Sequence, residues 1–351
     1  MKTVIKYCAI IFALLLAGSI ISGCVNAGVM IVRAIADKSG GEIKIDGKVV
    51  IDTNEWFSED SFGEVDGGFR MFGIQFGGTR ETKSGTYEVT GMVQEIRLDG
   101  VPGEVEIKRG DTFCVTYQNI PVEYRMEVRD GKLILEDESK GVFVIGINIT
   151  EHPYLCLTVP ENVELTKLTV DNGSGKLTVS DISPEKLELD GGSGSMSVKN
   201  ATVKNLMVDG GSGMVQLTNV TAETSNFDMG SGGFKVAEAA LGSTRLNSGS
   251  GSCVFEKTSA HNLSVDSGSG RVIYEGDLTG NCIFDSGSGI IRLFLAGKEE
   301  DYAIRASLGS GGLYINGNKE GRSGYYESRN NGVHSLIFNS GSGSVHVKFS
   351  E

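Results

Sequence analysis

The chain has 351 residues, enough for two ordinary domains, and it contains 50 glycines but only five prolines. Collagen is excluded because no Gly-X-Y triplet recurs. The formal net charge of −13 argues against a nucleic acid as partner, because a phosphate backbone attracts Lys and Arg.

The N-terminus carries a membrane signal. Lys2 and Lys6 precede an uncharged stretch, Tyr7 to Val32, that is long enough to cross a bilayer as a helix. A second interpretation competes, because the four residues that end at Cys24 resemble a lipobox, where a lipoprotein is cut before a cysteine that takes lipid. Residues 1–36 are therefore predicted to be a transmembrane anchor helix or a lipoprotein signal. Both would attach the chain to the cell membrane, with the rest on the extracellular side.

Residues 37–90 are predicted to be a linker followed by an irregular segment rich in glycine and aromatic residues. Between 53 and 85 there are six aromatic residues without clean periodicity: Trp56, Phe57, Phe62, Phe69, Phe72 and Phe76. Because the open end of a solenoid needs protection from edge pairing, this segment is either a loop or a cap over the first coil.

Residues 91–351 are predicted to form a parallel β-solenoid. Gly-Ser-Gly recurs in six consecutive steps of 19, starting at Gly173, Gly192, Gly211, Gly230, Gly249, Gly268 and Gly287. A fixed period near 20 residues is typical of stacked coils. The strict repeats occupy 168–296, and the last coils, 297–351, carry insertions.

Each repeat is predicted to form one three-sided coil. Apolar residues alternate with other types on both sides of the Gly-Ser-Gly turn, which places one set on a common strand face. At roughly 3.3 Å per residue, 19 residues trace a loop of about 60 Å. Three inward columns follow from this register: Val170, Leu189, Val208, Phe227, Leu246, Val265, Phe284; Leu177, Met196, Val215, Phe234, Cys253, Val272, Ile291; and Val179, Val198, Leu217, Val236, Phe255, Tyr274, Leu293.

The six cysteines do not indicate a disulfide framework. Cys253 and Cys282 occupy inward positions two coils apart, so they are expected to be small buried residues. Cys114 and Cys156 lie on predicted strands, and the sequence does not place them relative to one another.

The sequence resembles the bacterial putative-adhesin family with β-strand repeats, which has LiaG-like surface proteins among its members and no established function. The N-terminal membrane segment, the strand end at Pro160 and the Gly-Ser-Gly coils carry the resemblance. The closing pattern from Ile315 to Lys319, and then from Phe338 onward, is its most specific part. The resemblance implies an envelope-anchored β-solenoid.

One polar column invites a functional interpretation: Asp171, Asp190, Asp209, Asp228, Asn247, Asp266 and Asp285. Stacked carboxylates repel one another unless something neutralises them, so a ladder of Ca²⁺ sites is one hypothesis. The favoured hypothesis is a structural turn column, in which each side chain accepts backbone N–H groups of the glycine corner and Gly supplies φ > 0. No cofactor, metal or catalytic residue is predicted.

The composition and repeats favour a non-catalytic envelope protein, an adhesin or surface-binding scaffold, over two alternatives. One alternative is an envelope-stress signalling accessory, and the other, disfavoured, is a polysaccharide-acting β-helix enzyme. Expected partners are the membrane and either cell-wall polymers or surface proteins, with no nucleic acid; the oligomeric state is open. Binding is expected in the less regular parts, because loops on rigid scaffolds commonly carry function. The candidates are residues 53–85 and the insertion of the last coils with Tyr325 and Tyr326, the predicted binding loop; the alternative for each is a cap.

Overall fold

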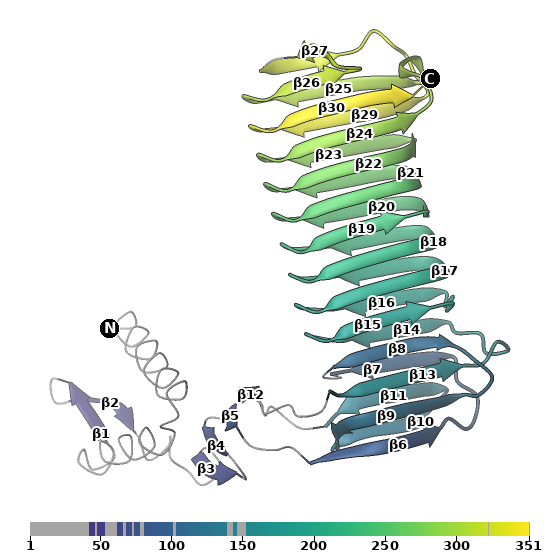
Figure 1. Ribbon diagram of the computed structural model, residues 1–351. Helices are drawn as coiled ribbons and strands as arrows, with labels where there is room; N and C mark the ends of the chain where they lie inside the picture. The colour runs from purple at the N-terminus through teal and green to yellow at the C-terminus, as the bar shows by residue number, and fades with distance from the viewer. Residues whose placement is uncertain are drawn as a thin grey trace. The chain divides into compact units, whose positions relative to one another are not determined.

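A computed structural model of the protein (Figure 1) describes residues 42–45, 48–52, 62–65, 68–71, 74–77, 81–100, 103–138, 143–145, 152–321 and 323–350. The predicted anchor, including Cys24, lies outside these residues. Within them, no helix has the length and apolar character needed to cross a membrane.

The chain divides into two compact units. The first comprises residues 1–79 and 141–148. It contains an antiparallel pair, β1 (Glu42–Ile45) and β2 (Lys48–Asp52), and a four-stranded sheet of β3 (Phe62–Val65), β4 (Gly68–Met71), β5 (Ile74–Gly77) and β12 (Phe143–Ile145). The second unit, 80–140 with 149–351, is the solenoid.

The solenoid is one continuous sheet of 24 strands. In chain order these are β6 (Thr82–Glu88), β7 (Glu95–Asp99), β8 (Glu104–Arg109), β9 (Cys114–Pro121), β10 (Tyr124–Arg129), β11 (Lys132–Asp137), β13 (Tyr154–Val159), β14 (Lys167–Asp171), β15 (Lys176–Ser180), β16 (Lys186–Asp190), β17 (Ser195–Asp209), β18 (Met214–Asp228), β19 (Gly233–Ala237), β20 (Ala240–Ser248), β21 (Ser252–Ser267), β22 (Arg271–Thr279), β23 (Asn281–Ser286), β24 (Ile290–Ala296), β25 (Tyr302–Leu308), β26 (Gly312–Ile315), β27 (Asn318–Gly321), β28 (Gly324–Glu327), β29 (His334–Ser340) and β30 (Ser344–Ser350). A short 3₁₀ turn, η1 (Glu299–Asp301), precedes β25. The sheet begins at Thr82, nine residues before the predicted boundary at 91.

The predicted all-β solenoid is confirmed, and so is its register. Neighbouring coils pair in parallel in steps of 19 residues: Val170 pairs with Leu189, Leu189 with Val208, and Val208 with Phe227. All members of the three predicted inward columns are buried. Cys253 and Cys282 are buried free thiols, as expected.

One coil shows how the alternation makes three faces. In β17 the inward pairs are Met196 with Val198, Ala201 with Val203, and Leu206 with Val208. Two consecutive exposed residues interrupt the alternation between these pairs, and each interruption is a corner. At the first of them Asn200 has φ 53°, a left-handed conformation that asparagine tolerates well.

The coils at both ends are not stacked in sequence order, which the sequence did not predict. At the C-terminal end β29 pairs with β23 on one side and with β25 on the other. The last coil of the chain, β29–β30, is thus inserted between the coil β23–β24 and the earlier coil β25–β26. At the N-terminal end, the coil β11–β13 packs beyond β7–β8, which pairs in turn with β14–β15.

Antiparallel strands close both ends of the solenoid (Figure 1). At the C-terminal end β27 pairs with β26 and β28 with β25. At the other end β10 pairs with β11, β9 with β13, and β6 with β9. These strands occupy edges that would otherwise offer unpaired N–H and C=O groups to another chain.

Candidate binding surfaces

The acidic column is in register along one outer edge of the solenoid. Asp171, Asp190, Asp209 and Asp228 pair in adjacent strands, and the column continues through Asn247, Asp266 and Asp285. Because the inward residue before each aspartate is buried, the carboxylates point outward.

The predicted turn role of this column is seen at one position. Asp209 Oδ1 accepts a hydrogen bond from the Gly211 amide at 3.1 Å. Within the described part of the chain, Asp171, Asp190 and Asp228 make neither a side-chain hydrogen bond nor an ion pair. The predicted positive φ of the corner glycine also holds only in part: it occurs at Gly173, Gly211 and Gly230 but not at Gly192, nor at the equivalent glycines from 249 onward.

These carboxylates border a groove of about 560 Å³ that crosses β11, β7, β14, β16, β17 and β18. We call it the acidic groove. Its lining has seven acidic residues, Glu95, Asp99, Asp171, Glu188, Asp190, Asp209 and Asp228, and three basic residues, Arg97, Lys132 and Lys167. Acidic charge therefore exceeds basic charge by four.

The basic side chains of the acidic groove are already paired. Lys132 contacts Glu95 at 2.8 Å, Arg97 contacts Asp99 at 3.0 Å, and Lys167 contacts Glu188 at 2.6 Å. The uncompensated charge is therefore concentrated on the row from Asp171 to Asp228.

The pKa shifts of Asp190 and Glu188 follow the same division between unpaired and paired carboxylates. Partial burial, and then the charges of Asp171 and Asp209, raise the pKa of Asp190. Partial burial also acts to raise the pKa of Glu188, but hydrogen bonds and charge from Lys167 and Lys186 outweigh it and lower that pKa to about 2. Glu188 is thus stabilised in its ionised form, whereas partial burial and the negative charges of Asp171 and Asp209 disfavour the ionised form of Asp190.

The acidic groove also contains an apolar contact. Met207, on β17 in the lining of the groove, is 42% exposed although it is a large hydrophobic residue. A flexible thioether side chain at this place can pack against the aliphatic part of a ligand.

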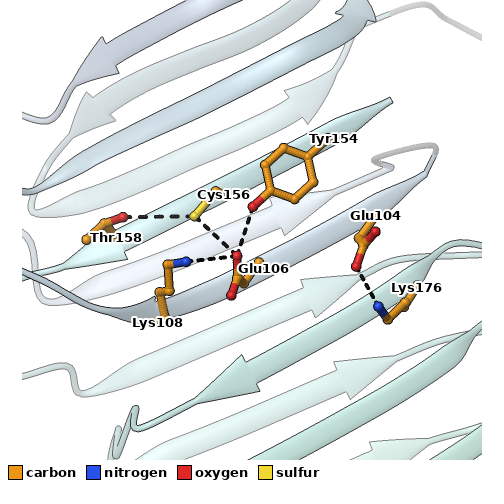
Figure 2. A network of polar contacts seen from close by, with 7 residues as sticks. All are labelled: Glu104, Glu106, Lys108, Tyr154, Cys156, Thr158 and Lys176. Atoms are coloured by element: carbon orange, nitrogen blue, oxygen red, sulfur yellow. Dashed lines mark hydrogen bonds and ion pairs between the residues drawn. The ribbon is translucent and has the colours of Figure 1, made fainter. Parts of the chain in front are cut away.

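A second polar cluster lies on another outer face, where β13 meets β8 (Figure 2). Glu106 accepts hydrogen bonds from Lys108 at 3.0 Å, from the Tyr154 hydroxyl at 2.8 Å and from the Cys156 thiol at 3.7 Å. The hydrogen bond from Lys108 is the main reason that the pKa of Glu106 is lowered. Each polar group of the cluster is satisfied by another, so the cluster joins the displaced coil of β13 to β8.

The structure places the two remaining cysteines of the solenoid on adjacent strands. Cys156 lies opposite Thr116, and Cys114 lies opposite Thr158, so the thiols are diagonal neighbours on one face. Cα atoms in such diagonal pairs are about 7–8 Å apart, which exceeds the usual disulfide span. Both cysteines are free.

The predicted binding loop is in fact a strand. Tyr325 and Tyr326 lie on β28, which pairs antiparallel with β25. Tyr325 is 69% exposed, and Tyr326 packs against the core. The insertion thus closes the end of the sheet, and a role of these tyrosines in binding stays a prediction. Within the described residues, no group of three or more His, Cys, Asp or Glu side chains could hold a metal ion.

Comparison with known sequences identifies the family. The sequence model of the Toastrack DUF4097 family matches residues 93–348, which is most of the solenoid. The chain belongs to the Toastrack family. The resemblance found in the sequence is thereby confirmed, and no curated protein matches this Toastrack chain.

Three solved structures resemble the Toastrack protein at low identity. One is a putative adhesin from Bacteroides fragilis, with 13% identity over 78% of this chain and 99% of that chain and a TM-score of 0.41. Another is a putative lipid binding protein from Parabacteroides distasonis, with 14% identity over 78% and 99% and a TM-score of 0.45. The third is a putative cell adhesion protein from Clostridium sporogenes, with 14% identity over 77% and 100% and a TM-score of 0.22. At these scores the likenesses carry no argument about function.

Proposed function

We propose that this Toastrack protein is a non-catalytic, membrane-anchored scaffold of the cell envelope, whose acidic groove binds a basic, extended segment of another surface protein. The observation that carries the proposal is the row of uncompensated carboxylates from Asp171 to Asp228 along an open groove. Its occupant has to supply positive charge, because the basic residues of the groove are already paired.

The spacing of the row favours an elongated partner. Adjacent strands of a sheet lie about 4.8 Å apart, so the four carboxylates span about 14 Å. In an extended polypeptide, side chains on one face recur about every 6.6 Å, so two or three Lys or Arg residues cover the row. Anionic wall polymers are disfavoured as partners because the same charges repel them.

A defined peptide tests this function. Fluorescent deca-lysine is expected to bind the full chain, deca-glutamate is not, and salt is expected to weaken the binding. The double variant Asp190→Asn, Asp209→Asn is expected to bind deca-lysine about tenfold more weakly, at up to about 1 kcal/mol for each exposed charge pair.

The same column provides a matched control. Asp266→Asn with Asp285→Asn removes two carboxylates of identical type that lie outside the acidic groove. This control is expected to bind deca-lysine nearly as well as the wild type. Equal loss in both double variants means that binding follows net charge alone, and the groove proposal then fails.

The anchor and the location are tested separately. The chain is expected in the membrane fraction, with its solenoid open to protease added outside the cells, and a chain that lacks residues 1–36 is expected to be released. Labelled palmitate is expected to enter the wild type but not Cys24→Ser if the anchor is a lipid, and to enter neither if it is a helix. A soluble full-length protein contradicts the anchored scaffold.

A further inference from the structure

Four serine side chains form a row inside the C-terminal half of the solenoid. They are Ser248, Ser267, Ser286 and Ser340, and they pair in successive coils. The first three come one residue after a member of the acidic column, and Ser340 comes after Asn339, which pairs with Asp285. The four serines are 5%, 2%, 7% and 6% exposed, respectively. We call them the buried serine row. None of their hydroxyl oxygens makes a hydrogen bond of normal geometry in the described part of the protein, although Ser248 lies close enough to the Cys253 thiol to act on its pKa.

Four such hydroxyls in consecutive coils need a physical explanation. Leaving one buried polar group unsatisfied is costly, and the large majority of buried polar atoms have a partner. The hydroxyls cannot satisfy one another directly. Their strands are about 4.8 Å apart, whereas an O–H···O hydrogen bond spans about 2.8 Å.

A water molecule between each pair fits this spacing. Two hydrogen bonds of about 2.8 Å bridge about 4.8 Å when the angle at the central oxygen is roughly 120°. This angle is close to the tetrahedral preference of water. The same geometry repeats at every step of the row, because the strands keep their register.

The interior at this corner accommodates more than a serine side chain. The equivalent positions in other coils hold Asn172 and Met229, which are 2% and 1% exposed. Met229 extends over the neighbouring coil, where a Cβ added to Gly210 would meet its Sδ and Cε at 3.1 Å. A serine side chain has two fewer heavy atoms than that of methionine, lacking the equivalents of Sδ and Cε, which leaves space of the order of one water, about 30 Å³.

The backbone of the serine corners also differs. In three of the four earlier described coils the amide of the last glycine closes the turn, as from Gly213 to the Gly210 carbonyl and from Gly232 to the Met229 carbonyl, both at 2.9 Å; Gly194 instead donates to the Gly173 carbonyl of the neighbouring coil at 3.3 Å. In the described corners that end at Gly251, Gly270 and Gly289 this bond is not made. At the Gly289 corner the hydroxyl lies close to that glycine, since a Cβ on Gly289 would be 3.0 Å from Ser286 Oγ. The free amide is a third partner for a bridging water, which typically makes about three hydrogen bonds.

We propose that the buried serine row binds a file of three internal waters, one in each gap between its four hydroxyls. Met229 closes the file at one end and Leu308, which pairs with Ser340, closes it at the other. A surface hollow of about 550 Å³ has Ser286 and Ser340 in its wall, and it provides the path by which these waters exchange.

Oxygen-17 magnetic relaxation dispersion of the full chain tests the file, because it counts waters held for longer than bulk exchange allows. Ser267→Met places at this coil the side chain that Met229 has naturally, and it is expected to remove two of the three waters. Ser269→Ala, which deletes an exposed hydroxyl of the same corner, is the matched control and is expected to remove none. An unchanged count in Ser267→Met overturns the proposal.

Ser267→Ala gives a second readout that does not depend on fitting a larger side chain. A hydroxyl that holds two waters stabilises the fold, so its removal is expected to lower the urea midpoint relative to Ser269→Ala. An unpartnered buried hydroxyl has the opposite effect, and its removal raises the midpoint. A raised midpoint therefore refutes the water file, even if Ser267→Met does not fold.

Discussion

The last glycine of each Gly-Ser-Gly corner is expected to be essential because of a close approach between coils, and Gly213→Ala tests this. A Cβ on Gly213 would lie 1.7 Å from the carbonyl oxygen of Gly194 in the neighbouring coil, whereas real Cβ contacts are essentially never under 3.0 Å. The two corners must therefore separate by about 1.3 Å, the difference between these distances.

The structure allows the cost to be worked out. Across the interface that must separate, the Ser212 amide donates to the Gly192 carbonyl at 2.8 Å. A separation of about 1.3 Å takes this bond beyond the normal range, at about 1 kcal/mol. Steric strain adds about 1–3 kcal/mol, and the lower entropy of the unfolded alanine chain offsets about 0.4–1 kcal/mol. Gly213→Ala is thus expected to destabilise the coil by about 1–3.5 kcal/mol.

Two neighbouring substitutions calibrate the measurement. Ser212→Ala removes an exposed hydroxyl that has no partner within the described residues, and it is expected to change stability by less than about 0.5 kcal/mol. At Gly173 the space is open but φ is +55°, so Gly173→Ala isolates the conformational penalty of about 1–2 kcal/mol.

Urea unfolding followed by far-UV circular dichroism gives the overall effect for each variant. Hydrogen exchange of peptides from 192–233 localises it, because the stability of a solenoid is a sum of coil and interface contributions. If Gly213→Ala is as stable as Ser212→Ala, the close approach of the coils does not explain the glycine, and the predicted loss of stability is refuted.

Three further predictions follow from burial, charge and topology. Because the pKa of Asp190 is raised in the folded state, ionisation of this carboxyl opposes folding above its ordinary pKa near 3.8. The urea midpoint of Asp190→Asn should therefore match that of the wild type at pH 3 and exceed it at pH 7. A lower midpoint than the wild type at pH 7 contradicts the assigned cost of this charge. Burial raises the pKa of the Cys253 thiol, which makes it unreactive in the folded protein. After maleimide treatment at pH 8, mass spectrometry should find Cys114 modified in the folded protein and Cys253 modified only after urea is added. Modification of Cys253 without urea contradicts its buried position. A chain that ends at residue 333 lacks the inserted coil, so a synthetic peptide of residues 334–350 should bind it and restore wild-type hydrogen-exchange protection of β23 and β25. A scrambled peptide should not restore this protection. If the shortened chain has wild-type protection without any peptide, the insertion is contradicted.

The strict repeats could be predicted from the sequence because two periods agree there. The 19-residue step aligns Val170, Leu189 and Val208, and the period-2 alternation on each side fixes which residues point inward. A slip of one residue would turn every one of these side chains outward. The local alternation and the 19-residue register therefore predict the same inward residues, and the structure confirms them.

The order of the end coils could not be predicted in the same way. Phe338 and Ala306 both fit the inward column next to Phe284, and alternation does not decide which of their coils packs there. The larger aromatic residue is the one that packs, with its ring stacked on Phe284 at a centroid distance of 5.4 Å. This choice depends on packing between residues 54 positions apart, which no local pattern contains.

The outward columns also carry information about the acidic groove. Lys167 and Lys186 lie one step of 19 apart, and Glu188 lies two residues beyond Lys186, so the register alone brings their charges together. Applied to outward residues, the same period predicts that the lysines pair with Glu188 and leave the aspartates uncompensated. The buried serine row follows from the same step, one residue beyond the acidic column.

The asparagine in the acidic column shows that the corner does not need the negative charge of an aspartate. Asn247 occupies the column in register with Asp228 and Asp266, so the corner forms without a carboxylate. Farther along, Asn339 donates a hydrogen bond to Asp285 at 2.6 Å, which relieves repulsion there. In the acidic groove four aspartates follow one another without such relief, and partial burial together with the charges of Asp171 and Asp209 raises the pKa of Asp190. Since an amide suffices for the fold, this local concentration of charge is better explained by a positively charged partner than by the turn.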